Sequence, residues 1–125
     1  MAMAPVSTVA HLAREVVSLF STGDLERLES LIAPDYVDHQ GLRGTTVHGP
    51  AGFRTVVESA RGALADLEVS IEDLVASGQT ACLRIRWSGI RGDGRRVDRE
   101  TIDMLRFEHH LMVEHWGAES SSKLA

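Results

Sequence analysis

An aspartate inside an apolar stretch is the residue of this 125-residue chain best suited to do chemistry. Asp103 lies between Ile102 and Met104, in a segment whose alternation predicts a β-strand. Burial disfavours the charged form of a carboxyl group, so a buried aspartate is either paired with a cation or kept for proton transfer in a pocket. Both interpretations stay open, because Arg84 or Arg86 on the neighbouring predicted strand could neutralise Asp103.

A second group of polar residues, Tyr36, Asp38 and His39, lies in a segment with several glycines and no clear period. Their side chains could hydrogen-bond a substrate carbonyl or an enolate oxygen, where negative charge develops in aldol or isomerase chemistry. The alternative is a polar network that only anchors a loop. Tyr36 is the only tyrosine of the chain.

The last two predicted strands fix which residues share a face with Asp103. A two-residue turn at His109 and His110 would place Asp103 opposite Trp116, on the same face of the sheet. This register predicts that Trp116 lines the pocket and that His115 points to the other face, unless a β-bulge shifts the pairing. We therefore expect His39, ahead of His115, to be a site residue.

The elements that must position these residues come in a simple order, helices first and strands afterwards. This order predicts an α+β fold with three N-terminal helices on one face of a curved, antiparallel, four- to six-strand sheet. We expect a single domain over residues 1–119 and a polar tail over 120–125. The apolar periodicity predicts helices over 9–20, 25–32 and 50–64, strands over 67–77, 81–88, 95–108 and 111–117, and a small extra strand near Val37.

Composition excludes several classes of partner. The formal net charge of −5 argues against nucleic acid, which needs an excess of lysine and arginine. No stretch approaches the ~20 apolar residues of a membrane span, and no signal peptide is recognisable, so we expect no membrane partner and a cytoplasmic location. Cys82, the only cysteine, cannot form an intramolecular disulfide and is expected to pack as a small apolar residue. His109 and His110 lack a further fixed ligand, and no glycine-rich loop opens a helix, so neither a metal nor a cofactor is expected.

Several segments, taken together and in order, resemble the SnoaL-like polyketide cyclases, which belong with ketosteroid isomerases to the nuclear transport factor 2-like superfamily. The resemblance covers nearly the whole chain. The segments are FSTGDL at 20–25, APDYVDH at 33–39, DLVASG at 73–78, DMLRF at 103–107 and EHW at 114–116.

The resemblance implies a cone of curved sheet and helices around an apolar pocket, usually in a homodimer. It implies that Asp103 is the acid/base, without metal or cofactor, in cyclisation or isomerisation of a small hydrophobic carbonyl substrate. Tyr36 and His39 are the expected catalytic companions of Asp103. The expected substrate-binding residues are Trp116, Trp87, Phe53, Phe20, Leu105 and Asp38.

Two alternatives stay open. Limonene epoxide hydrolases resemble this fold and use an Asp-Arg-Asp set. The candidates here are Asp103 and Asp38 for the two aspartates, and Arg84, Arg86 or Arg99 for the arginine. The family commonly carries a longer insertion where this chain has only SGIRGDG at 88–94. That shortened loop favours a non-catalytic, ligand-binding dimer of the same fold.

Overall fold

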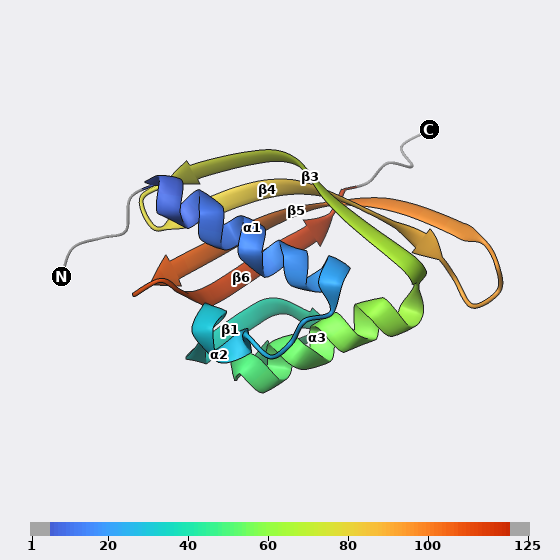
Figure 1. The fold of residues 1–125 in the computed structure, drawn as a ribbon, viewed down its shortest axis with the longest axis horizontal. Helices are drawn as coiled ribbons and strands as arrows, with labels where there is room; N and C mark the ends of the chain where they lie inside the picture. The colour runs from blue at the N-terminus through green and yellow to red at the C-terminus, as the bar shows by residue number, and fades with distance from the viewer. Residues whose placement is uncertain (1–5, 121–125) are drawn as a thin grey trace.

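The computed structural model describes residues 6–120, in which three helices lie against one six-stranded sheet (Figure 1). The three predicted helices and the four C-terminal strands are confirmed, but two strands precede the third helix, and the second of them was not predicted. The helices are α1 (Val6–Thr22), α2 (Leu28–Leu31) and α3 (Gly49–Ala63). The strands are β1 (Ile32–Leu42), β2 (Thr45–His48), β3 (Ala65–Ser77), β4 (Thr80–Ile90), β5 (Arg96–Glu108) and β6 (Leu111–Glu119).

The sheet has the order β2-β1-β6-β5-β4-β3 and is mixed and not closed. The expectation of a purely antiparallel sheet needs a correction, because β1 pairs with β6 in parallel. Hairpin turns impose antiparallel pairing on β1–β2 and on β3 to β6, whereas most of the chain separates β1 from β6 and no turn sets their direction. The expected small strand near Val37 is the eleven-residue β1, and only α2 forms within the predicted second helix.

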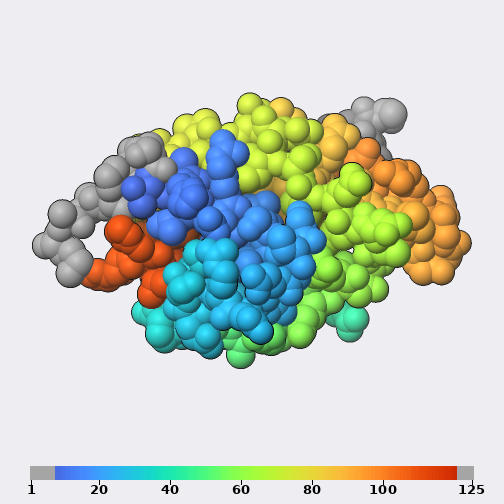
Figure 2. All heavy atoms as spheres, in the orientation of Figure 1, coloured from blue at the N-terminus to red at the C-terminus, as the bar shows by residue number. Residues whose placement is uncertain are grey.

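The helices cover one face of the sheet, and the core lies between them. On β4 the buried residues Ala81, Leu83 and Ile85 alternate with Cys82, which is exposed on the other face. The expectation that Cys82 packs inside is therefore wrong, because neighbouring residues of a strand point to opposite faces. Figure 2 shows α1 and the residues that follow it covering the middle of the helical face, with the β4–β5 hairpin extending at one end.

A β-bulge in β6 changes the register that the sequence predicts. The turn has the expected two residues, and His109 and His110 adopt φ of 51° and 66°, as such a hairpin requires. Phe107 pairs with Met112, but Arg106 pairs with Glu114, so Val113 is an extra residue in β6. Beyond the bulge, Met104 lies opposite Trp116 and Asp103 lies opposite Gly117. The predicted pairing of Asp103 with Trp116 is wrong by one residue.

Two further expectations concern membrane spans and the C-terminal tail. No helix within residues 6–120 is long and apolar enough to cross a membrane. The predicted polar tail lies, apart from Ser120, outside the described residues.

Candidate active site

A pocket of about 360 Å³ lies between the helices and the covered face of the sheet. Seven of the nine predicted site residues line it: Tyr36, Asp38, Asp103, Phe20, Phe53, Trp87 and Leu105. The edges of the aromatic rings meet around this space, with the Phe20 ring centroid 5.0 Å from that of Trp87 and 5.7 Å from that of Phe53. The wall is therefore mainly apolar, with a few polar groups at fixed positions.

Asp103 is 5% exposed and hydrogen-bonds through both of its carboxylate oxygens. The Thr101 hydroxyl donates to Oδ2 at 2.6 Å, and the His115 ring lies with Nε2 2.7 Å from Oδ1. Trp87 donates its indole N–H to the Thr101 oxygen at 2.8 Å, which orients that hydroxyl toward Asp103. The carboxylate is thus held at the pocket wall by neighbours on three strands.

Neither arginine that could have neutralised Asp103 contacts it. Arg84 pairs with Asp73 and Glu100, and Arg86 pairs with Glu72 and Asp98, all on the other face of the sheet. The sequence left an arginine ion pair open as the structural explanation of Asp103. The structure places a histidine there instead.

His115 bridges two buried carboxylates. Its Nδ1 lies 2.8 Å from Oδ1 of Asp38, while its Nε2 faces Asp103. Burial by itself lowers the pKa of His115, but the hydrogen bonds and charges of Asp103 and Asp38 outweigh burial and raise the pKa to about 9. At neutral pH the ring is therefore an imidazolium that donates to both carboxylates.

Asp38 is 2% exposed and is held by the backbone as well as by His115. The N–H groups of Gln40 and Gly41 donate to its Oδ1 at 3.0 and 2.9 Å. Burial raises the pKa of Asp38, but the hydrogen bond and the charge of His115, and then the Gly41 N–H and the Tyr36 hydroxyl, bring the pKa below its usual value. Gly41 has a φ of 57°, and a Cβ there would lie 1.7 Å from the Thr45 carbonyl oxygen, so only glycine fits.

Tyr36 supplies a buried hydroxyl beside Asp38. Its side chain is fully buried, and no hydrogen bond of good geometry joins its hydroxyl to another group among residues 6–120. Burial, then the charge of Asp38 and a hydrogen bond to it, and least Asp103 raise the pKa of Tyr36 far above its ordinary value. The hydroxyl therefore keeps its proton, for which Asp38 and a molecule in the pocket are competing acceptors.

The bulge puts Trp116 on the other face of the sheet, and His39 lies there too because it follows the pocket-facing Asp38 on β1. Their rings stack with centroids 4.9 Å apart, and Nε2 of His39 lies 2.8 Å from a carboxylate oxygen of Glu114. Glu114 also pairs across the strands with Arg106 at 2.5 Å. The structure therefore places neither His39 nor Trp116 in the pocket, contrary to their expected positions.

His115 is the site residue that the register argument missed. The apolar run Leu111, Met112 and Val113 was the available signal, because a regular strand with one covered face does not place three apolar residues in succession. Met112 and Val113 are both buried, as the bulge explains. Among residues 6–120, no cluster of histidine, cysteine and acidic side chains has the arrangement of a metal site.

An open, curved sheet covered by three helices around a pocket is the fold of the nuclear transport factor 2-like superfamily. Within that superfamily the chain belongs to the SnoaL-like domain family, whose model matches residues 13–115. A search of curated proteins finds no match.

Solved structures with the same fold include a candidate polyketide cyclase from Bacillus cereus, with a TM-score of 0.81 and 23% identity over 91% of this chain and 75% of that one. TsrD from Streptomyces laurentii has a TM-score of 0.80 and 24% identity over 94% and 91% of the two chains. IdmH, a candidate polyketide cyclase from Streptomyces antibioticus, has a TM-score of 0.78 and 25% identity over 90% and 91%. The recognition of the family from sequence is thereby confirmed.

Proposed function

We propose that this protein is a cofactor-free acid/base enzyme that cyclises or isomerises a small hydrophobic, polyketide-like carbonyl compound. The observation that carries the proposal is the position of Asp103, a carboxylate at the wall of an apolar pocket that is oriented by Thr101 and His115 and paired with no arginine. The SnoaL-like family and its neighbours named as candidate polyketide cyclases support the same class of chemistry.

In this proposal Asp103 removes a proton from the carbon next to a carbonyl group. The electron pair of the broken C–H bond forms an enolate, whose oxygen accepts a hydrogen bond from the Tyr36 hydroxyl. In cyclisation, the enolate carbon bonds to a second carbonyl carbon of the same molecule, and Asp103 returns its proton to the new alkoxide. In isomerisation, the proton returns to a different carbon.

His115 acts in this scheme as a positioning residue. Its ring holds one oxygen of the Asp103 side chain at the pocket wall, and Asp38 fixes the orientation of the ring. His39 and Trp116, which lie on the other face, have no role in the proposed chemistry.

The test replaces Asp103 by Asn, which keeps the shape and removes the titratable group. With a substrate found by screening of linear 1,3-dicarbonyl compounds, we expect turnover to fall by about 10²-fold or more, with the thermal unfolding midpoint little changed. Asp98→Asn is the matched control, since Asp98 lies on the same strand but on the other face, beside Arg86. Unchanged turnover in the Asp103 variant would rule out the mechanism and favour a ligand-binding protein.

Epoxide opening is the second candidate, and one observation favours it. Asp38 reaches the same cationic group as Asp103, so the site has two carboxylates flanking a cation, although the cation is His115 and not an arginine. One carboxylate would take a proton from a water molecule whose oxygen bonds to an epoxide carbon. The C–O bond of the ring at that carbon breaks, and the released oxygen takes up a proton to give the diol. Incorporation of ¹⁸O from labelled water into a diol product would distinguish this reaction from cyclisation, in which no solvent oxygen enters.

A further inference from the structure

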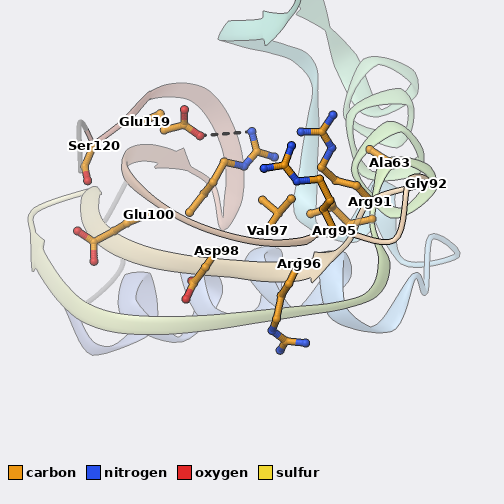
Figure 3. A pocket seen from close by; sticks show the side chains of 12 residues that line it. Ala63, Arg91, Gly92, Arg95, Arg96, Val97, Asp98, Glu100, Glu119 and Ser120 are labelled. Carbon is orange, nitrogen blue, oxygen red and sulfur yellow. Dashed lines mark ion pairs between the residues drawn. The ribbon is translucent and has the colours of Figure 1, made fainter. Parts of the chain in front are cut away.

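A second hollow, of about 840 Å³, lies where the pocket opens, beside the β4–β5 hairpin (Figure 3). Its wall comes from the end of α3, the hairpin and the ends of β5 and β6. Ala63, Arg99 and Glu119 line both hollows, so the apolar pocket continues into this outer space. We call Arg91, Arg95 and Arg99, which line it, the mouth arginines.

The alternation of β5 connects the mouth to the proposed base. Arg99 and Thr101 lie on the face of the sheet that carries Asp103, and Arg99 is opposite Trp87 on β4. Arg99 lies four positions before Asp103 on the strand, so their Cα atoms are roughly 13 Å apart. One elongated molecule could therefore contact both.

The mouth carries three arginines against Glu119 and Asp93, on a protein with a formal net charge of −5. Arg96, Asp98 and Glu100 also line the hollow, but Glu100 and Asp98 pair with Arg84 and Arg86 on the other face of the sheet. Figure 3 shows the side chains of Arg91 and Arg95 directed into the same space, while Arg96 points to the opposite side of the strand. Carboxylates compensate these charges only in part. Glu119 lies 3.3 Å from Arg99, Asp93 lies 3.8 Å from Arg91, and no acidic group within residues 6–120 pairs with Arg95.

The arginines elsewhere on the sheet are differently placed. Arg84, Arg86 and Arg106 each contact two carboxylates. Guanidinium groups that gather without enough carboxylates repel one another, and a bound oxyanion relieves that repulsion through charge-assisted hydrogen bonds.

We propose that the mouth arginines bind an anionic end group, a carboxylate or a phosphate ester, of the molecule whose carbonyl end reaches Asp103. This inference rests on the proposed function and adds to it a substrate class: an elongated, mainly apolar carbonyl compound with an acidic group roughly 13 Å from the reacting carbon. The apolar pocket binds the apolar part of the substrate, and the mouth arginines bind its anionic end group.

The test measures binding alone and so does not depend on turnover. The probes are 6-(2-naphthyl)hexanoate, its primary amide and a naphthylalkyl phosphate of equal length, titrated calorimetrically at low ionic strength. We expect the acid to bind about tenfold more tightly than the amide, and 0.5 M NaCl to remove most of this preference. Tighter binding of the phosphate than of the carboxylate would identify a phosphate ester as the natural group; the reverse would identify a free acid.

Arg95→Gln and Arg99→Gln should each reduce the ratio of the two affinities, acid over amide, from about tenfold to about threefold or less. Glu119→Gln should increase it, because it frees Arg99. Arg96→Gln is the matched control. Arg96 also lines the hollow and has no acidic partner among the described residues, but its side chain points to the opposite side of the strand from the mouth arginines (Figure 3). Equal affinities of acid and amide for the unmodified protein, or an equal loss in the Arg96 variant, would overturn the proposal.

The same titration in Asp103→Asn separates this inference from the proposed function. The preference for the acid should persist there, because the mouth does not depend on the base. If the variant keeps both the preference for the acid and full turnover, the anion-binding role of the mouth arginines is supported and the mechanism through Asp103 is rejected. If Asp103→Asn itself removes the preference, the mouth arginines are not the source of the selectivity for the acid.

Discussion

His115 keeps a positive charge in a nearly enclosed site because it has a carboxylate on each side. Its side chain is 13% exposed, so solvent screens these contacts little. Removal of either carboxylate would leave a cation with one partner, and removal of His115 would leave two buried carboxylates facing each other. The three groups therefore depend on one another for their charge states.

This dependence predicts how stability changes with pH. The pKa of His115 is about 9 in the folded protein and near 6.5 when unfolded, so folding is favoured by the proton that His115 binds. That contribution, about 3 kcal/mol, is complete below pH 6.5 and is lost as the pH rises through 9. Urea unfolding at pH 6.5 and pH 10 should show the loss in the unmodified protein and in His39→Gln, but not in His115→Gln. An equal loss in His115→Gln would show that other groups cause it.

The buried hydroxyl of Tyr36 predicts a separation of activity from stability. Tyr36→Phe should lower kcat/KM by about 10²- to 10³-fold if the hydroxyl binds the enolate oxygen. The free energy of unfolding should change by less than about 1 kcal/mol, because the hydroxyl makes no hydrogen bond of good geometry in the folded protein. Turnover and chemical denaturation of the same preparation would check both. A large loss of stability would show instead that Tyr36 has a structural partner.

At the scale of elements, the bulge in β6 decides which side chains enter the pocket. One extra residue, Val113, moves His115 onto the face of Asp103 and moves Trp116 onto the other. The same shift places Gly117 directly opposite Asp103. A glycine is needed there because a Cβ at that position would lie 2.6 Å from Oδ1 of Asp103 and 2.5 Å from the Gln40 side-chain oxygen.

Gly117→Ala should therefore displace the Asp103 carboxylate and reduce turnover by at least tenfold in a protein that still folds. The displaced group is the short side chain that two neighbours hold, so it has little room to move. Gly62→Ala in α3 is the control, since nothing lies within 4 Å of its added Cβ and alanine favours the helix by about 1 kcal/mol. Turnover and thermal unfolding of both variants test this, and full activity of Gly117→Ala would contradict the geometry.

At the scale of the whole molecule, the face of the sheet without helices carries exposed apolar side chains. Ile102, Met104 and Trp116 are 48%, 41% and 36% exposed, which is typical of a surface that meets another protein. The resemblance to SnoaL-like cyclases implies that the partner is a second copy of the chain. We expect sedimentation at micromolar concentration to give twice the 13.7 kDa of one chain, and Met104→Glu to give monomers. A monomeric unmodified protein would contradict the dimer.

The sequence determined the three helices, the four C-terminal strands and Asp103 as a buried acid, because apolar periodicity and short turns act locally. The family followed from the resemblance of several segments. The sequence also placed Tyr36 and Asp38 near Asp103, through the resemblance. The tertiary structure decided the parallel pairing of β1 with β6, the His115 partner and the outward positions of His39 and Trp116. Those features depend on one extra residue in β6 and on contacts between distant segments, and side chains of a strand exchange faces when pairing shifts by one residue.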